Sequence, residues 1–366
     1  MSHAVYLHVG TAKSGTTYLQ RILSRNRELL KKSGVLYPGD RSSHFMASMD
    51  LRNAGFKGYV YPEAEGAWNR VVKEVQEFPG DAVISHETLA RTPPKLVRKA
   101  VESFPGRDVR VVFTCRDLGR QIPAAWQERV KNRNPQTYAA YLAKVYDGWN
   151  DGQTVASSTF WRGQNLIQLT RRWSRVVGAE NLRLVTVPAP GADPNELWSR
   201  FAGATGLPLL DYEIDVTPSN ASMGTAGTEL LRRLNPLFPE ELTWPQYEVR
   251  VKNRFVLRDL TQHDTGGRLT VPEERRTATD KLAAQMIDYL RDSGCTVIGD
   301  LEDLRPAYRP DGMLPDEVST EQLLDLSLHV IAGMAARRRP GHGELSGTQA
   351  ARLLARKAWR KLLPRR

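Results

Sequence analysis

Near its start the chain reads Val5-Tyr6-Leu7-His8-Val9, followed by Gly10-Thr11-Ala12-Lys13-Ser14-Gly15-Thr16-Thr17. The first five residues are mostly apolar and predict a buried strand, and the glycine-rich run predicts the turn after it. Apolar residues at helical spacing begin at Tyr18. A helix N-terminus after such a turn presents free backbone N–H groups and the positive end of the helix dipole. The stretch therefore predicts an anion-binding loop.

The side chains of this loop also suit phosphate. Lys13 adds a full positive charge, and the hydroxyl groups of Thr16 and Thr17 can donate hydrogen bonds to phosphate oxygens. An ordinary strand-to-helix turn is the alternative, but such a turn does not require lysine, serine and two threonines together. We therefore expect the loop to bind a phosphate group.

The spacing differs from that of a nucleoside triphosphatase loop, which requires Gly, four residues, and then Gly-Lys followed by Ser or Thr. Gly10 and Gly15 have the correct separation, but Thr16 follows the second glycine and Lys13 precedes it. The lysine therefore lies earlier in the loop than the usual triphosphate-binding lysine.

The stretch Thr11-Ala12-Lys13-Ser14-Gly15-Thr16-Thr17-Tyr18-Leu19 instead resembles the 5′-phosphosulfate loop of sulfotransferases that use 3′-phosphoadenylyl sulfate (PAPS). That family often has proline before the lysine, where this chain has Ala12. The resemblance implies that residues 12–17 hold the 5′-phosphate of PAPS. It also implies that Lys13 neutralises the charge on the leaving phosphate oxygen as the sulfuryl group is transferred.

The rest of the chain predicts an α/β fold with a central parallel sheet, because apolar strands alternate with helical patterns. Strands are expected at residues 5–9, 34–38, 82–85, 108–114 and 182–187, and a strand or turn at residues 296–301. Residues 40–61 are expected to be irregular. The expected helices lie at residues 18–32, 67–78, 95–104, 137–146, 165–177, 195–205, 270–292 and 320–334, with another after Gly224.

Polar residues follow three of the expected strands. Lys13 follows the first, His86-Glu87 follows the strand at residues 82–85, and Arg116 follows the strand at residues 108–114. Ligands of open α/β sheets bind at the carboxyl ends of the strands. We therefore expect these three clusters to converge at one edge of the sheet.

Arg116 is the candidate for a second phosphate contact. In the sulfotransferase pattern this arginine binds the 3′-phosphate of the donor, together with a serine eight residues later, where this chain has Ala124. Arg120 lies one helical turn before Ala124 and can compensate from the same face of the helix. The alternative for Arg116 is an ion pair with Asp117 or another neighbour.

His86 and Glu87 are the candidates for the general base that takes the proton of the acceptor hydroxyl. By its position after the strand, His86 resembles the catalytic histidine of cytosolic sulfotransferases, and we prefer it. Bacterial and carbohydrate-acting relatives often use a glutamate, which would be Glu87. A third possibility is that both are polar residues at a strand end without a catalytic role.

Two later segments are also candidates. The segment Ser219–Gly224 resembles a loop of bacterial sulfotransferase relatives, although its spacing equally suits a helix N-cap. Basic residues further on can cover the nucleotide, but the Arg-Lys-Gly closing motif of the cytosolic family is not visible. These basic residues are Arg250, Lys252, Arg254 and Arg258.

Composition indicates a soluble globular protein, with 40% hydrophobic and 25% charged residues among 366. The two cysteines, Cys115 and Cys295, lie far apart in sequence and predict no disulfide framework. No apolar run reaches the roughly 18 residues of a membrane span, and the first strand begins where a secretory signal would lie. We therefore expect a cytoplasmic protein.

The net charge of +11 is unevenly distributed. Residues 337–366 contain ten Lys and Arg and one Glu, a net charge of +9, which leaves +2 for residues 1–336. The sequence thus predicts a nearly neutral catalytic domain at 1–336 and a basic tail with an amphipathic helix at 337–366. Such a helix suits an anionic membrane surface or an acidic partner, or it is a solvated tail.

These features together predict a PAPS-dependent sulfotransferase of bacterial type that acts on a hydroxyl group of a small-molecule or glycan acceptor. The seven scattered histidines have no metal-ligand spacing, so no metal is expected, and no feature predicts a specific nucleic-acid partner. Two alternatives stay open: a nucleotide-dependent kinase, and a non-catalytic binding module that has lost its grip on the donor.

Overall fold

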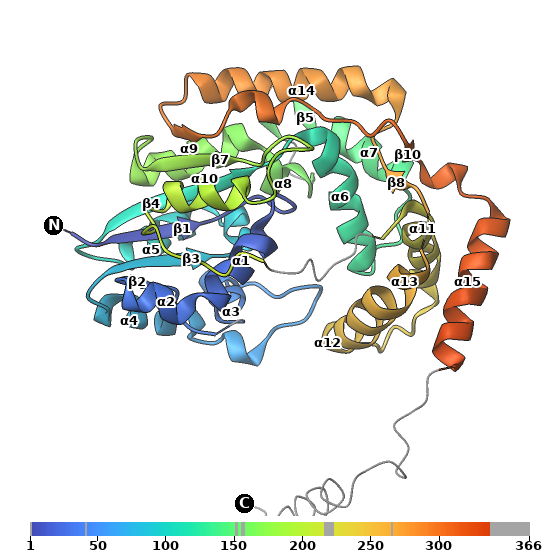
Figure 1. Cartoon of the computed structure of the whole chain (residues 1–366), viewed down its shortest axis with the longest axis horizontal. Coiled ribbons are helices and arrows are strands. Elements are labelled where there is room, and N and C mark those ends of the chain that lie inside the picture. Colours follow the sequence, from blue (N-terminus) through green and yellow to red (C-terminus); the bar gives the residue numbers. More distant parts are fainter. Residues whose placement is uncertain are drawn as a thin grey trace, which may run out of the picture.

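The computed structural model of the chain describes residues 2–40, 42–150, 153–154, 158–215, 223–264 and 266–336, with residues 153–154 as backbone only. Its centre is a six-stranded parallel sheet in the order β2-β3-β1-β4-β7-β9 (Figure 1). The strands are β1 (Ala4–His8), β2 (Val35–Leu36), β3 (Asp81–Ser85), β4 (Asp108–Cys115), β7 (Leu182–Thr186) and β9 (Thr296–Ile298). The predicted α/β class with a central parallel sheet is confirmed.

Helices cover both faces of the sheet, so its central strands are apolar on both sides. Val5 and Leu7 of β1 pack on one face, and Tyr6 between them packs on the other. The first face is covered by α4 (Ala67–Glu77), α5 (Pro94–Glu102), α6 (Leu118–Lys131) and α9 (Leu166–Val177). The opposite face is covered by α1 (Thr16–Arg25), α2 (Arg27–Lys32) and α10 (Glu196–Ala204).

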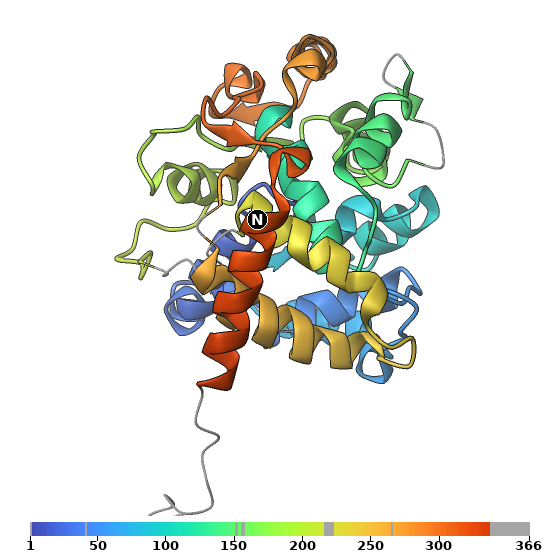
Figure 2. The ribbon, with the colours of Figure 1, turned by 90° about the vertical axis from the view of Figure 1, so that its right-hand side faces the viewer.

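A largely helical region lies beside the sheet (Figure 1). It includes α11 (Thr225–Leu234), α12 (Trp244–Tyr247), the π-helix η4 (Glu248–Leu260) and α13 (Thr261–His263). Along its outer side runs α15 (Thr320–Ala335), which faces the viewer in Figure 2 and contacts α11 and η4. Further helices and strands are α7 (Tyr138–Tyr146), β5 (Trp149–Asn150), β6 (Gln153–Thr154), α8 (Trp161–Gln164), β8 (Arg268–Leu269), α14 (Glu273–Arg291) and β10 (Gly312–Met313), with short 3₁₀ turns between some of them.

The stretch from 40 to 61 differs from the prediction of an irregular segment, because it contains the helix α3 (Ser43–Leu51). Its buried face includes two polar residues, His44 and Ser48. His44 Nε2 lies 2.8 Å from the carbonyl oxygen of Pro38, and its Nδ1 accepts a hydrogen bond from the N–H of Ser85. These polar contacts replace the apolar pattern by which a sequence usually reveals a helix.

Cys115 is buried, Cys295 is partly buried, and both are free thiols. None of the helices in the described ranges combines the length and the apolar character that a membrane crossing needs. The predicted basic tail, residues 337–366, falls outside the described residues.

Two buried histidines predict acid sensitivity. Burial lowers the pKa of His8 to about 3 and that of His44 to about 4. In the unfolded chain a histidine titrates near pH 6.5, so below that pH the unfolded state binds more protons. We expect the free energy of unfolding to fall by up to about 1.4 kcal/mol per pH unit for each histidine between about pH 6.5 and pH 4.

Urea unfolding at several pH values measures this slope. His44→Gln should make it shallower, whereas His3→Gln, at an exposed position, should leave it unchanged. Equal stability of the natural protein at about pH 7 and about pH 5 would contradict the expectation.

Candidate functional site

The loop between β1 and α1 is wound tightly. Gly10, Lys13 and Gly15 have φ angles of 51°, 72° and 82°, in the left-handed region. At Gly10 a Cβ atom would lie 2.6 Å from Cγ2 of Thr16, so only glycine fits this turn. Lys13 adopts an uncommon backbone conformation for a residue with a side chain.

Serine and threonine hydroxyls brace the loop from inside. Ser14 is fully buried, and its Oγ donates to the carbonyl oxygen of Thr11 at 2.6 Å and lies 2.6 Å from Oγ1 of Thr114 on β4. Of the two threonines predicted to bind phosphate, Thr16 is buried and Thr17 is exposed. Ser14 therefore maintains the shape of the loop and has hydrogen-bond partners within the protein.

Two buried glutamines hold the loop from the other side, and sequence reasoning missed both. Gln121 Nε2 and Gln164 Nε2 each donate to the carbonyl oxygen of Ala12 at 3.0 Å. Gln121 also donates to Oε1 of Gln164 at 2.8 Å, and each residue is 3% exposed. The sequence feature that could have indicated this role is Gln121, a polar residue on the apolar face of α6.

The side chain of Lys13 forms an ion pair with α6. Its Nζ lies 2.5 Å from Oε2 of Glu128, and the other carboxylate oxygen accepts a hydrogen bond from Nζ of Lys252 at 2.8 Å. Burial alone would raise the pKa of Glu128, but the two ammonium groups hold it well below its ordinary value. The three side chains thus form a triad with a net charge of +1.

Arg116, at the carboxyl end of β4, contacts the same loop. Its Nη1 donates to the carbonyl oxygen of Lys13 at 3.2 Å, and its buried Nε has no hydrogen-bond partner among the described residues. Burial, together with the charge of Arg120, lowers the pKa of Arg116 to about 10, so it stays protonated at neutral pH. A buried guanidinium with an unused donor is suited to an anionic ligand.

Asp117 pairs with Arg120 and not with Arg116. The carboxylate accepts hydrogen bonds from Nε and the backbone N–H of Arg120, and from the N–H of Ala307 at 3.0 Å. Arg120 Nη2 also donates to the carbonyl oxygen of Pro188 at 3.1 Å. Arg120 is thus held by protein groups one turn before Ala124, and its contact with a donor phosphate stays a prediction.

A further cation, Arg309, lies near Arg116 and was missed in the sequence. The segment that carries it crosses the start of α6, where a Cβ at Gly119 would lie 2.7 Å from the carbonyl oxygen of Ala307. Arg309 is exposed and close enough for its charge to lower the pKa of Arg116. The local sequence, Arg309-Pro310-Asp311-Gly312, does not indicate that Arg309 lies near Arg116.

His86 and Glu87 follow β3. His86 Nδ1 accepts a hydrogen bond from the N–H of Thr88 at 3.2 Å and lies 2.7 Å from its hydroxyl oxygen. Because Nδ1 acts as an acceptor, the proton of the neutral ring is on Nε2. Glu87 accepts a hydrogen bond from Gln20 at 3.4 Å, and its Cβ would lie 3.5 Å from a Cβ at Gly10.

Glu87 is ionised at neutral pH. Burial raises its pKa, but the charge of His86, a backbone hydrogen bond, Gln20 and Lys13 together lower the pKa of Glu87 below its ordinary value. The carboxylate therefore faces the loop as a proton acceptor, whereas His86 presents a protonated Nε2.

The three predicted clusters lie at one edge of the sheet, as expected from the strand ends. β1 lies between β3 and β4 (Figure 1), and all three strands are parallel. The N–H of His86 donates to the carbonyl oxygen of His8 at 3.1 Å, and the N–H of Thr11 donates to that of Thr114 at 3.1 Å. Lys13, Glu87 and Arg116 are thereby brought to the same loop.

Of the four later basic residues, Lys252 reaches the site through Glu128. Arg258 pairs with Asp259, and Arg250 and Arg254 are exposed. In the segment Ser219–Gly224, residues 219–222 lie outside the described part. Gly224 is the N-cap of α11, where its N–H donates to the Asp264 carboxylate at 2.6 Å.

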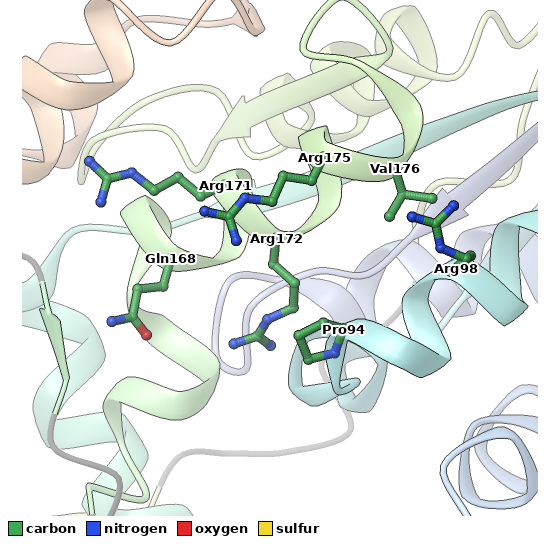
Figure 3. Close-up of a pocket in the computed structure, with 7 residues that line it drawn as sticks. All are labelled: Pro94, Arg98, Gln168, Arg171, Arg172, Arg175 and Val176. Atoms are coloured by element: carbon green, nitrogen blue, oxygen red, sulfur yellow. The ribbon is translucent and has the colours of Figure 1, made fainter.

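A separate basic groove lies between α5 and α9 (Figure 3). It has a volume of about 430 Å³ and contains none of the predicted site residues. Its lining residues are Pro94, Arg98, Gln168, Arg171, Arg172, Arg175 and Val176. Among the residues described, no group of three or more His, Cys, Asp or Glu is arranged to hold a metal ion.

Comparison with known proteins gives one structural match. No family model matches the chain, and no curated protein matches it. Among solved structures, a sulfotransferase from Alicyclobacillus acidocaldarius aligns with a TM-score of 0.40 and 16% sequence identity, over 67% of this chain and 100% of that chain.

Proposed function

We propose that this protein is a sulfotransferase that transfers a sulfuryl group from PAPS to a hydroxyl group of an acceptor. The observation that carries the proposal is the contact between the Arg116 guanidinium and the Lys13 carbonyl, within a loop wound around Gly10. One anion-binding loop thereby has a lysine and a buried, partly unpartnered arginine beside it. These groups suit a donor with a 5′-phosphosulfate and a 3′-phosphate.

In this proposal the donor supplies an activated sulfuryl group. The acceptor oxygen forms a bond to sulfur while the bond from sulfur to the 5′-phosphate oxygen breaks, which releases adenosine 3′,5′-bisphosphate. Lys13 neutralises the charge on the departing oxygen, and the backbone N–H groups of the loop orient the phosphate. Arg116 holds the 3′-phosphate through charge-assisted hydrogen bonds.

Glu87 is the better-placed proton acceptor, although the sequence pattern favours His86. The carboxylate is ionised and lies beside the loop, while the Nδ1 atom of His86 is occupied by Thr88. In this assignment Glu87 takes the proton of the acceptor hydroxyl, and His86 lies beside it, with Nδ1 4.0 Å from a carboxylate oxygen of Glu87.

Binding and turnover of the nucleotide test the proposed function. Calorimetric titration with adenosine 3′,5′-bisphosphate should give a single site, and PAPS should be consumed in the presence of a panel of phenols, alcohols and sugars. Absence of bisphosphate binding at millimolar concentration would reject the proposal and favour a binding module. Magnesium-dependent turnover of ATP would favour a kinase instead.

Substitution of Glu87 separates the two candidate bases. Glu87→Gln keeps the shape but removes the base, so kcat should fall by about 10²- to 10⁴-fold while bisphosphate affinity changes little. Because the pKa of Glu87 is lowered, the rate of the natural enzyme should stay nearly constant from about pH 8 to about pH 6. A rate that declines over this pH range, or a larger loss of kcat in His86→Gln than in Glu87→Gln, would contradict the assignment of Glu87 as the base.

A further inference from the structure

Four cations near the candidate site have no carboxylate partner among the described residues. They come from four segments: the end of α3, the loop after it, the 3₁₀ turn η2 (Glu87–Arg91), and α6. The four are Arg52, Lys57, Arg91 and Arg129. This differs from the loop lysine, whose charge is shared with Glu128.

The hydrogen bonds of these cations leave donors unused. Arg129 donates to Oγ1 of Thr159 at 2.5 Å and to Gln136 at 3.4 Å, both neutral groups. The Nε atoms of Arg129 and Arg52 are buried and have no partner within the described part of the chain. Part of this positive charge is thus withdrawn from water with no described carboxylate within ion-pair distance.

The cations also lie close to one another. Burial and the charges of Arg162 and Arg129 lower the pKa of Arg91, and this outweighs the opposing effect of the Glu87 carboxylate. Burial and the charges of Arg91 and Arg162 lower the pKa of Arg52. Burial and the charge of Arg129 lower the pKa of Lys57. Arg91 and Lys57 are nevertheless exposed, so they can reach a ligand from solvent.

A chain of contacts links these cations to the reacting groups. The ring of Phe45 lies 5.3 Å from that of His86, and the ring of Phe56 lies 5.0 Å from that of Trp244. The chain runs through His86, Phe45, Phe56, Trp244, Lys252 and Glu128. Lys57 directly follows Phe56, and Arg129 directly follows Glu128. Arg91 lies on the same 3₁₀ turn as Glu87, and the charge of Glu87 acts on it, so the cations lie near the candidate base.

This positive region is distinct from the one around Arg116. Along α6, a rise of about 1.5 Å per residue separates Arg129 from Arg120 by about 14 Å. The positive charges that lower the pKa of Arg116 are Arg120 and Arg309, and none of the four cations. The phosphates of the proposed donor explain the positive charges around Arg116. They leave the region of the four cations without a ligand.

We propose that the acceptor is itself an anion, whose carboxylate, phosphate or sulfate group is bound by Arg52, Lys57, Arg91 and Arg129 while its hydroxyl group faces Glu87. This inference rests on the proposed sulfotransferase function. Like charges gathered in a partly buried site repel one another, and a bound anionic group offsets this repulsion by attracting all of them. Arginine clusters in such sites select carboxylate, phosphate and sulfate groups.

The test is a calorimetric titration of the full-length protein saturated with adenosine 3′,5′-bisphosphate, so that the donor site is filled. Inorganic phosphate, sulfate and malonate are the probes, and at least one should bind at a single site at millimolar concentration. Binding of malonate alone would indicate that the acceptor carries a carboxylate group. Binding of phosphate or of sulfate would indicate that the acceptor carries a phosphate or a sulfate ester, respectively.

The variant Arg91→Gln/Lys57→Gln should weaken this binding by about tenfold or more. Both side chains are exposed and donate no hydrogen bond to a described residue, so the fold should be retained. Without added anion the variant should melt at the same or a higher temperature, because two repelling charges are removed.

The matched control is Arg98→Gln/Arg175→Gln, which removes two exposed arginines from the groove between α5 and α9 (Figure 3). It should leave anion binding unchanged. Failure of all three probes to bind the natural protein, or equal binding by the Arg91/Lys57 variant, would overturn the proposal. Loss of binding in the groove variant alone would also overturn it.

The two proposals can fail separately. If the bisphosphate does not bind, the sulfotransferase function is rejected, and the titration is repeated on the free protein with Lys13→Ala for comparison. Loss of anion binding in the Arg91/Lys57 variant but not in Lys13→Ala would still support an anion site at the four cations. The reverse pattern would reject that site.

Discussion

Lys13→Ala should abolish sulfuryl transfer, with a loss of about 10³-fold or more in kcat, because the charge that forms on the leaving oxygen would be left unpaired. The effect on stability should be small. The Lys13 and Glu128 side chains are 31% and 30% exposed, and Lys252 continues to pair with Glu128 in the variant. The free energy of unfolding should therefore change by about 1 kcal/mol or less.

Two measurements and a control variant make this result specific. PAPS turnover gives kcat, urea unfolding gives the stability, and Lys31→Ala, at an exposed position in α2, serves as the matched control. Lys13→Arg keeps the positive charge but replaces the compact ammonium group with a planar guanidinium, so it should recover only part of the rate. Full activity of Lys13→Ala would show that another group neutralises the leaving oxygen.

The sheet and most helices could be predicted from the sequence because burial on both faces makes parallel strands continuously apolar. Val111, Val112 and Phe113 of β4 are all fully buried, and this run was visible in the sequence. α3 could not be predicted, because part of its buried face is polar. His44 and Ser48 are satisfied by Pro38, Ser85 and Thr88, residues that only the folded chain brings near.

The site was predictable to the extent that it depends on strand ends. The approach of Lys13 to Arg116 follows from the adjacent parallel strands β1 and β4. The partners of these residues did not follow, because Glu128 lies 115 positions from Lys13 and meets it only through the packing of α6 against the loop. Likewise, Arg309 reaches Arg116 through a connection whose path the local sequence does not encode.

His86 illustrates a different limit. Its position after a strand is visible in the sequence, but which ring nitrogen carries the proton depends on the hydrogen bond that Nδ1 accepts from the N–H of Thr88. A 3₁₀ turn begins directly after His86 and provides that donor. Choosing between His86 and Glu87 therefore requires backbone geometry as well as residue type.

Arg116→Ala should remove the preference of the protein for a 3′-phosphate. The affinity for adenosine 3′,5′-bisphosphate should fall by about 100-fold, since two charge-assisted hydrogen bonds contribute about 3 kcal/mol. The affinity for adenosine 5′-monophosphate, which has no 3′-phosphate, should change little. Comparing both ligands with both proteins isolates the interaction between Arg116 and that phosphate.

Arg120→Ala is the informative control for this experiment. Arg120 is held by Asp117 and Pro188, so its removal leaves a buried carboxylate without its cation and should lower the melting temperature. If its role is to position Asp117 and α6, both nucleotides should weaken to a similar extent. A selective loss of bisphosphate binding in Arg120→Ala, with Arg116→Ala unaffected, would transfer the 3′-phosphate contact from the end of β4 to the first turn of α6. The same result would explain how the chain tolerates alanine at position 124, because Arg120 would then supply the missing hydrogen bond.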